Sequence, residues 1–260
     1  MLYNTLSLIT VSCYLMAAIL QALFFTARLK GRQTLVFYLG LIATLGHGWL
    51  LYHWIDTSLG QNLTSFNLFS QAAWFVALIQ LFLALRKPIE NMGIFIFPIS
   101  AVSIVLAVVF PGKNLVDTAA NWIGLGHLLL AIMAFSILCL AACQALLVGI
   151  QDWQLKAKDT SHALRILPPM ETMETLLFQF IVVGFFFLSI LIGYSFYFFQ
   201  HIFMPPLLSK TLLALLAWII FAVLLLGRFL CGWRSRTAVR WTLSGVILLL
   251  VCYLISQLLT

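Results

Sequence analysis

The sequence predicts an all-α polytopic membrane protein with eight transmembrane helices. Of its 260 residues, 63% are hydrophobic and only 8% are charged, and the mean hydropathy is +1.10. A soluble globular domain carries about 25% charged residues, so the composition excludes that class. The apolar residues are also gathered into runs of about 20, the length of helix that crosses the hydrocarbon core of a bilayer.

Eight apolar runs follow one another along the chain, separated by short polar segments. The longest polar segment, 151–172, is too short to bury a core of its own. We therefore expect a single integral membrane domain over residues 1–260, with 151–172 as a cytoplasmic connector. The expected helices cover residues 3–27, 34–55, 66–85, 92–110, 120–150, 173–199, 208–229 and 237–258.

The basic residues are concentrated on one side of these helices. Twelve of the fourteen Lys and Arg lie in or beside the loops that follow the first, third, fifth and seventh runs. Because Lys and Arg are retained on the cytoplasmic side, this asymmetry predicts that both termini lie on the outer, periplasmic side. Basic residues follow the first run and do not precede it, so we expect an anchor and not a cleavable signal peptide. The net charge of +7 then reflects topology and predicts no nucleic-acid partner.

Enzyme motifs are absent from the sequence. It contains no P-loop, no G-x-G-x-x-G and no H-E-x-x-H pattern, and its acidic residues fall in loops or near helix ends. A nucleophile, a base and an oxyanion-binding group cannot be assembled from what remains. We therefore expect no catalytic residue in this chain.

Two histidines inside the apolar runs, His47 and His127, are the main candidate functional residues. Ionisable side chains in the membrane are costly and often mark a site, although a single histidine can equally pack against a neighbouring helix. At about 1.5 Å per residue, His47 lies roughly 12 Å and His127 roughly 10 Å below the outer end of its helix. This matched depth favours a shared ligand in the outer half of the bilayer.

The surroundings of both histidines fit a haem but do not require one. Neutral imidazole is a good axial ligand for haem iron, so the haem iron is the metal we expect His47 and His127 to hold. Without a C-x-x-C-H motif, the expected cofactor is haem b, held non-covalently. Small residues at helical spacing would admit a flat ligand or, more commonly, close helix packing; they are Gly40, Ala43 and Thr44 beside His47, and Gly124, Ala131 and Ala134 beside His127.

Further candidates lie nearer the outer face. His201, which follows the sixth run, is a reserve haem ligand and the weakest of the three candidates, and His53 lies at the outer end of the second run. Tryptophans are available to stack on a porphyrin, although several of them sit at helix ends, as is typical of the interfacial belt. They are Trp49, Trp54, Trp74, Trp122 and Trp218.

Three segments between residues 122 and 234 carry a family resemblance. Residues 167–174 read Leu-Pro-Pro-Met-Glu-Thr-Met-Glu and open an apolar run that contains spaced glycines. Residues 231–234 read Cys-Gly-Trp-Arg after the next apolar run, and residues 122–127 read Trp-Ile-Gly-Leu-Gly-His. In order and spacing, these segments resemble the cytochrome c assembly (CcsA-like) haem-handling family over roughly residues 120–255.

The resemblance implies a multi-pass protein of the bacterial inner membrane that binds or handles haem, with another membrane or periplasmic protein as its partner. Family members that deliver haem to apocytochrome c carry a tryptophan-rich W-G-x-x-W-x-W-D segment. Here the corresponding residues 201–209 read His-Ile-Phe-Met-Pro-Pro-Leu-Leu-Ser. The chain is thus similar to a short, stand-alone branch of the family, for which a ligase-like role in cytochrome c maturation would need a partner chain.

A second hypothesis from a different class stays open at this point. The chain would be a haem-free accessory membrane subunit that binds a partner protein or supports ion or solute transport. The histidines would then only pack between helices, and their replacement would change stability or partner binding without any spectral consequence.

Overall fold

The computed structural model describes residues 2–26, 34–57, 60–112, 114–116, 122–157, 167–199 and 207–258. Within these ranges the chain is nearly all helical, and eight helices are long and apolar enough to cross a membrane. The eight predicted helices are confirmed; which side of the membrane the termini occupy stays a prediction. The helices are α1 (Leu2–Phe25), α2 (Thr34–Ile55), α3 (Ser65–Ala84), α4 (Gly93–Val109), α5 (Trp122–Lys156), α7 (Met170–Phe198), α8 (Leu207–Cys231) and α9 (Ser235–Leu258), with a short 3₁₀ turn, η1 (Glu90–Met92), before α4.

Helix α5 is the element that differs most from its predicted length. It continues to Lys156, whereas the sequence predicts an end near residue 150. A helix of 35 residues is about 52 Å long, which exceeds the hydrocarbon core of about 30 Å. An ion pair of 2.7 Å between Lys156 Nζ and the Asp152 carboxylate, four residues apart, supports these last turns.

Three short strands form an antiparallel sheet that the all-α prediction does not contain. They are β1 (Asp56–Thr57), β2 (Gly60–Asn62) and β3 (Leu115–Val116), paired in the order β1-β2-β3. Gly60 has φ +125°, a conformation open to a residue without a side chain. Strands of two or three residues leave no alternating pattern in the sequence, so only the structure reveals them.

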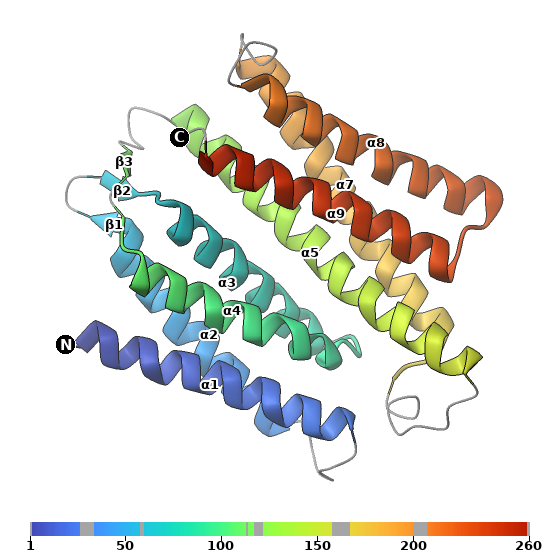
Figure 1. Ribbon diagram of the computed structural model, residues 1–260, viewed down its shortest axis with the longest axis horizontal. Helices are drawn as coiled ribbons and strands as arrows, with labels where there is room; N and C mark the ends of the chain where they lie inside the picture. Colours follow the sequence, from blue (N-terminus) through green and yellow to red (C-terminus); the bar gives the residue numbers. More distant parts are fainter. Residues whose placement is uncertain are drawn as a thin grey trace. The chain divides into compact units, whose positions relative to one another are not determined.

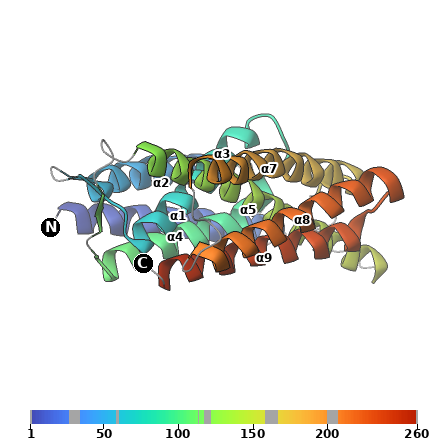
Figure 2. The same cartoon turned by 90° about the horizontal axis from the view of Figure 1, so that it is seen from above.

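The chain divides into two compact units. Unit 1 contains α1 to α4 with the three strands, and unit 2 contains nearly all of α5 together with α7, α8 and α9. In unit 1, α1 packs against α2 and α4, and α3 packs against the same two helices (Figures 1 and 2). The core between them is formed by fully buried side chains such as Leu50, Phe97 and Ile104.

In unit 2, α8 and α9 form a tight helical hairpin, and α7 packs against α8. The two helices of the hairpin lie side by side in both views (Figures 1 and 2). Close approach depends on Gly245 of α9, because a Cβ atom there would lie 2.7 Å from the buried ring of Phe221. Gly232, with φ +65°, lies in the connection and permits the tight turn between the helices.

Candidate functional site

His47 lies in the core of unit 1 with both ring nitrogens hydrogen-bonded. Its Nε2 lies 2.8 Å from Ser70 Oγ on α3, and its Nδ1 lies 3.4 Å from the Tyr14 hydroxyl oxygen on α1. Tyr14 itself donates its proton to Thr44 Oγ1 at 3.2 Å, so His47 Nδ1–H is the donor to Tyr14. The lone pair of His47 Nε2 then accepts the Ser70 hydroxyl proton. The His47 side chain is 0% exposed, and nothing about it is unsatisfied.

Protein side chains fill the space beside the small residues next to His47, so that space is not open to a ligand. A Cβ atom added at Gly40 would lie 2.8 Å from the Phe97 ring, and Ala43 and Thr44 are buried. Trp74 donates its indole N–H to the Thr44 carbonyl oxygen at 2.8 Å, which fixes its ring within unit 1. The packing interpretation of these small residues therefore fits this side of the molecule.

His127 has a different environment on α5 in unit 2. Its Nδ1 lies 3.2 Å from Ser195 Oγ on α7. The Ser195 hydroxyl proton is donated to the Leu191 carbonyl oxygen at 2.8 Å, so Ser195 Oγ accepts the proton of His127 Nδ1. His127 Nε2 then carries a lone pair, and in the part of the chain that the structure describes this atom has no hydrogen-bond partner.

The approach of α5 to α7 is what brings Ser195 within reach of His127. Tyr194 donates its hydroxyl to the Ile123 carbonyl oxygen at 3.0 Å, and a Cβ atom at Gly126 would lie 2.8 Å from the same hydroxyl oxygen. The edge of the His127 ring meets Phe199, with ring centroids 5.5 Å apart. The half-buried imidazole is thus oriented by one helix, α7, while its Nε2 stays available.

The two remaining histidines near the predicted outer face are His53 and His201. His53 lies at the strand end of unit 1, among the rings of Tyr3, Trp49 and Tyr52, with centroids 5.0 to 5.3 Å apart. His201 lies outside the described residues. Within the described ranges, no group of three His, Cys, Asp or Glu side chains is placed to hold a metal ion.

Four of the five tryptophans proposed as porphyrin-stacking residues have other contacts or face outward. Trp218 donates to Ser189 Oγ at 2.9 Å and stacks on Phe185 at a centroid distance of 5.4 Å. Trp49 and Trp122 are 57% and 62% exposed, as expected for side chains that face lipid or its interface. Stacking of these rings on a haem stays a prediction.

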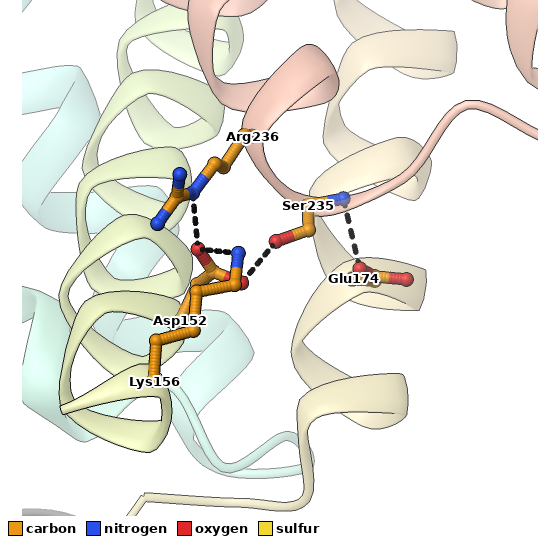
Figure 3. A network of polar contacts seen from close by, with 5 residues as sticks. All are labelled: Asp152, Lys156, Glu174, Ser235 and Arg236. Atoms are coloured by element: carbon orange, nitrogen blue, oxygen red, sulfur yellow. Dashed lines mark hydrogen bonds and ion pairs between the residues drawn. The ribbon is translucent and has the colours of Figure 1, made fainter. Parts of the chain in front are cut away.

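At one end of unit 2, a polar network joins Glu174, from the family-like segment 167–174, to the residues that directly follow the Gly-Trp-Arg turn (Figure 3). Glu174 of α7 accepts the backbone N–H of Ser235 at 2.9 Å, and Asp152 of α5 accepts the Ser235 hydroxyl at 2.8 Å. Asp152 also pairs with Arg236 Nε at 2.8 Å and with Lys156. Two carboxylates from α5 and α7 therefore hold the first turn of α9, where the helix dipole favours negative charge.

The same segments make further contacts that hold unit 2 together. Gln151 Nε2 donates to the Pro168 carbonyl oxygen and Gln144 Nε2 to that of Met173, each at 3.0 Å. In the Gly-Trp-Arg turn, Arg228 donates to the Trp233 carbonyl oxygen at 3.1 Å, and its guanidinium lies 4.6 Å from the centroid of the Phe178 ring. These residues thus hold the helices of unit 2 together. His127, whose Nε2 is available, lies elsewhere in the same unit.

Sequence reasoning located the histidines but not the residues that distinguish them. Ser195, Ser70 and Tyr14 decide what each imidazole nitrogen can do, and all three come from helices other than the one that carries the histidine. Hydroxyl residues are common in membrane helices, and none of these three belongs to a motif. No signal in a single sequence would have singled them out.

Comparison with known proteins relates the whole chain to one family. The family model described as "Cytochrome C assembly protein" matches residues 3–260. The inner membrane protein YpjD of Escherichia coli K12 is 26% identical over 206 residues, which cover 78% of this chain and 76% of the relative. Its counterparts in the O6:H1 and O157:H7 strains match equally well. No solved structure matches this chain. With the eight membrane-length helices, these relatives place the chain in the inner membrane as a multi-pass protein.

Proposed function

Because the chain belongs to the cytochrome c assembly protein family, whose membership indicates a haem-related function, we propose that it binds haem b non-covalently with His127 as the principal axial ligand. The observation that carries this proposal is the tautomer of His127. Its Nδ1–H is directed to Ser195, and its Nε2 lone pair has no competing donor among the described residues. A bound haem would supply the iron centre, and this chain's residues would bind and orient it.

Ser195 acts in the proposal as the residue that positions the ligand. Histidines that ligate a metal nearly always donate their second ring N–H to a carboxylate, a carbonyl or a water, which fixes the tautomer and the ring orientation. The hydroxyl oxygen of Ser195, 3.2 Å from His127 Nδ1, fills this role. Its own proton is engaged with Leu191, so it does not compete for the ring nitrogen.

His47 is the second ligand candidate, and its hydrogen bonds make ligation more demanding. Its Nε2 lone pair already accepts from Ser70, 2.8 Å away. Ligation of iron through this nitrogen requires that bond to be exchanged for the metal, which leaves a fully buried serine hydroxyl without its partner. We propose for the same reason that His47 holds unit 1 together in the haem-free protein.

In this proposal, the distribution of Lys and Arg determines on which side of the membrane the haem would be held. The basic residues support an outer location for both termini, and His127 lies near the start of α5, opposite the end that carries Lys156. The haem would therefore be held in the outer half of the bilayer. A membrane or periplasmic protein that receives or donates haem is the expected partner.

A haem-free accessory role is the alternative, and two observations favour it. His47 is fully satisfied by protein groups, and the chain lacks the tryptophan-rich segment of family members that present haem. In this role the chain binds a partner protein or supports ion or solute transport, and both histidines serve helix packing.

Visible spectroscopy separates the two functions. We would purify the protein in detergent from haem-replete cells, record oxidised and reduced spectra, and then titrate with haemin. The proposal predicts a haem signal in the wild type that is lost or becomes five-coordinate in His127→Ala. The matched control, His53→Ala, removes a histidine from unit 1 and should leave the spectrum unchanged. A wild-type protein without haem that also fails to bind added haemin would support the accessory role.

A further inference from the structure

Unit 1 contains a pocket of about 430 Å³ at the end that carries the three strands. Its wall is built from separate parts of the unit, with Tyr3 and Asn4 from α1, His53 and Trp54 from α2, and Asn67 from α3, and the segment after α4 closes it. The volume falls within the usual range for small-molecule sites, roughly 300–1,000 Å³. The pocket belongs wholly to unit 1, and His127 belongs to unit 2.

Asn67 gives the pocket an amide oxygen that accepts no hydrogen bond from the described residues. This residue is only 6% exposed. Its Nδ2 donates to the Asn62 carbonyl oxygen at 3.1 Å, and its backbone N–H donates to Thr64 Oγ1 at 3.4 Å. Its Oδ1 has no hydrogen-bond partner within the described ranges. An amide oxygen only accepts hydrogen bonds, so Asn67 Oδ1 can pair with a ligand that offers a hydroxyl or N–H proton.

The other polar groups around the pocket both donate and accept. The Tyr3 hydroxyl, the Asn4 amide and the His53 ring make no hydrogen bond to any described residue, and each can act in either direction. The Trp54 indole N–H is likewise unused in this part of the chain and can only donate. A ligand with acceptor oxygens alone would leave Asn67 unpaired, whereas hydroxyl groups match the whole set.

The charge and the aromatic rings of the pocket lining further restrict the chemical class of ligand that the pocket can bind. None of the described residues that line the pocket is Lys, Arg, Asp or Glu, so these residues offer no counter-charge to an ionised phosphate, carboxylate or ammonium group. Tyr3, His53 and Trp54 contribute three aromatic rings to the pocket lining, and aromatic faces accept the C–H face of a sugar ring.

We propose that this pocket binds a sugar ring, either free or as the head group of a glycolipid. A sugar carries hydroxyls that donate to Asn67 and accept from Trp54, an apolar C–H face that stacks on the aromatic rings, and no net charge. Each of these properties corresponds to a group of the pocket wall. The proposal is independent of haem binding, because all the lining residues belong to unit 1 and His127 belongs to unit 2.

The test measures sugar binding to the intact chain in nanodiscs of phosphatidylcholine, after purification in a detergent without a sugar head group. The probes are glucose, maltose, N-acetylglucosamine and dodecyl maltoside, the last below the concentration at which it forms micelles. Saturation-transfer NMR and calorimetry would report binding. We expect saturable binding of at least one probe and a loss of about tenfold in affinity in Trp54→Ala.

The matched control is Trp49→Ala, because Trp49 lies on the same helix and is 57% exposed but does not line the pocket. Its affinity should equal that of the wild type. Asn67→Ala removes the amide oxygen and should weaken binding by about tenfold. If this variant does not fold, Trp54→Ala still tests the proposal. Binding of glucose, maltose or N-acetylglucosamine would identify the ligand as a free sugar. Binding of dodecyl maltoside alone would identify it as the head group of a glycolipid. Failure of all four probes, or equal affinities in Trp54→Ala and Trp49→Ala, overturns the proposal.

Discussion

His47 and His127 both carry their proton on Nδ1. They differ in the surroundings of Nε2. In unit 1, His47 Nε2 accepts from Ser70 inside a core formed by four helices. In unit 2, His127 Nε2 has no partner among the described residues, and only Nδ1 is engaged, by Ser195. Two residues that the sequence presents as equivalent are therefore a structural imidazole and an available one. Depth in the membrane does not separate these roles, but the hydroxyl groups of neighbouring helices do.

The largest expected effect concerns the stability of unit 1. His47→Ala removes a fully buried ring, leaves a cavity and deprives Ser70 of its partner. We expect the free energy of unfolding to fall by about 3 kcal/mol. His127→Ala removes a half-buried ring with one hydrogen bond and should cost no more than about 1 kcal/mol.

Unfolding of the two purified variants in the same detergent, followed by circular dichroism, measures this difference. Equal losses in both variants would remove the distinction between the two histidines.

The second prediction concerns the residue that orients His127. Ser195→Ala leaves His127 Nδ1–H without its acceptor and frees the ring to rotate or to change tautomer. Loss of such a supporting partner typically lowers metal affinity by about 10- to 100-fold, so we expect haemin affinity to fall by at least about tenfold.

Ser244→Ala is the matched control for this change, because Ser244 is an exposed serine of unit 2 that also bonds the carbonyl oxygen four residues earlier. A haemin titration in which both variants keep the wild-type affinity would show that Ser195 does not position the ligand.

The smallest expected effects concern two glycines. A methyl group at Gly40 meets the Phe97 ring at 2.8 Å, whereas a methyl group at Gly193 meets nothing within 4 Å. Gly40→Ala should lower the free energy of unfolding by about 1–2 kcal/mol, and Gly193→Ala should raise it by about 0.5 kcal/mol through helix propensity. Thermal unfolding of both variants would check the signs, and a stabilising Gly40→Ala would contradict the packing of unit 1 described above.

The membrane architecture could be predicted from the sequence because its signal is strong and local. Runs of apolar residues fix the number of helices, and seven of the eight have ends within a few residues of their predicted positions. Helix α5 runs further because Asp152 and Lys156, read in the sequence as polar connector residues, form an ion pair along one helix face. The strands β1 to β3 are too short to leave a pattern.

The site was predictable only in part, because its decisive contacts join helices that are far apart in the sequence. Ser195 lies 68 residues from His127, and Tyr14 lies 33 residues from His47. The stripe of small residues beside His47 was compatible with a ligand or with packing, and the ring of Phe97 favours packing. Glu174 was recognised as part of the family-like segment 167–174, but its hydrogen bond with the backbone N–H of Ser235 is visible only in three dimensions.

Chemical rescue tests the central claim, that His127 is the available ligand, most directly. His127→Gly would be purified, loaded with haemin and titrated with imidazole while the visible spectrum is recorded, with His47→Gly treated in parallel. We expect His127→Gly to lose the wild-type haem spectrum and imidazole to restore it. A His127→Gly protein whose spectrum equals that of the wild type before imidazole is added would show that His127 is not the ligand.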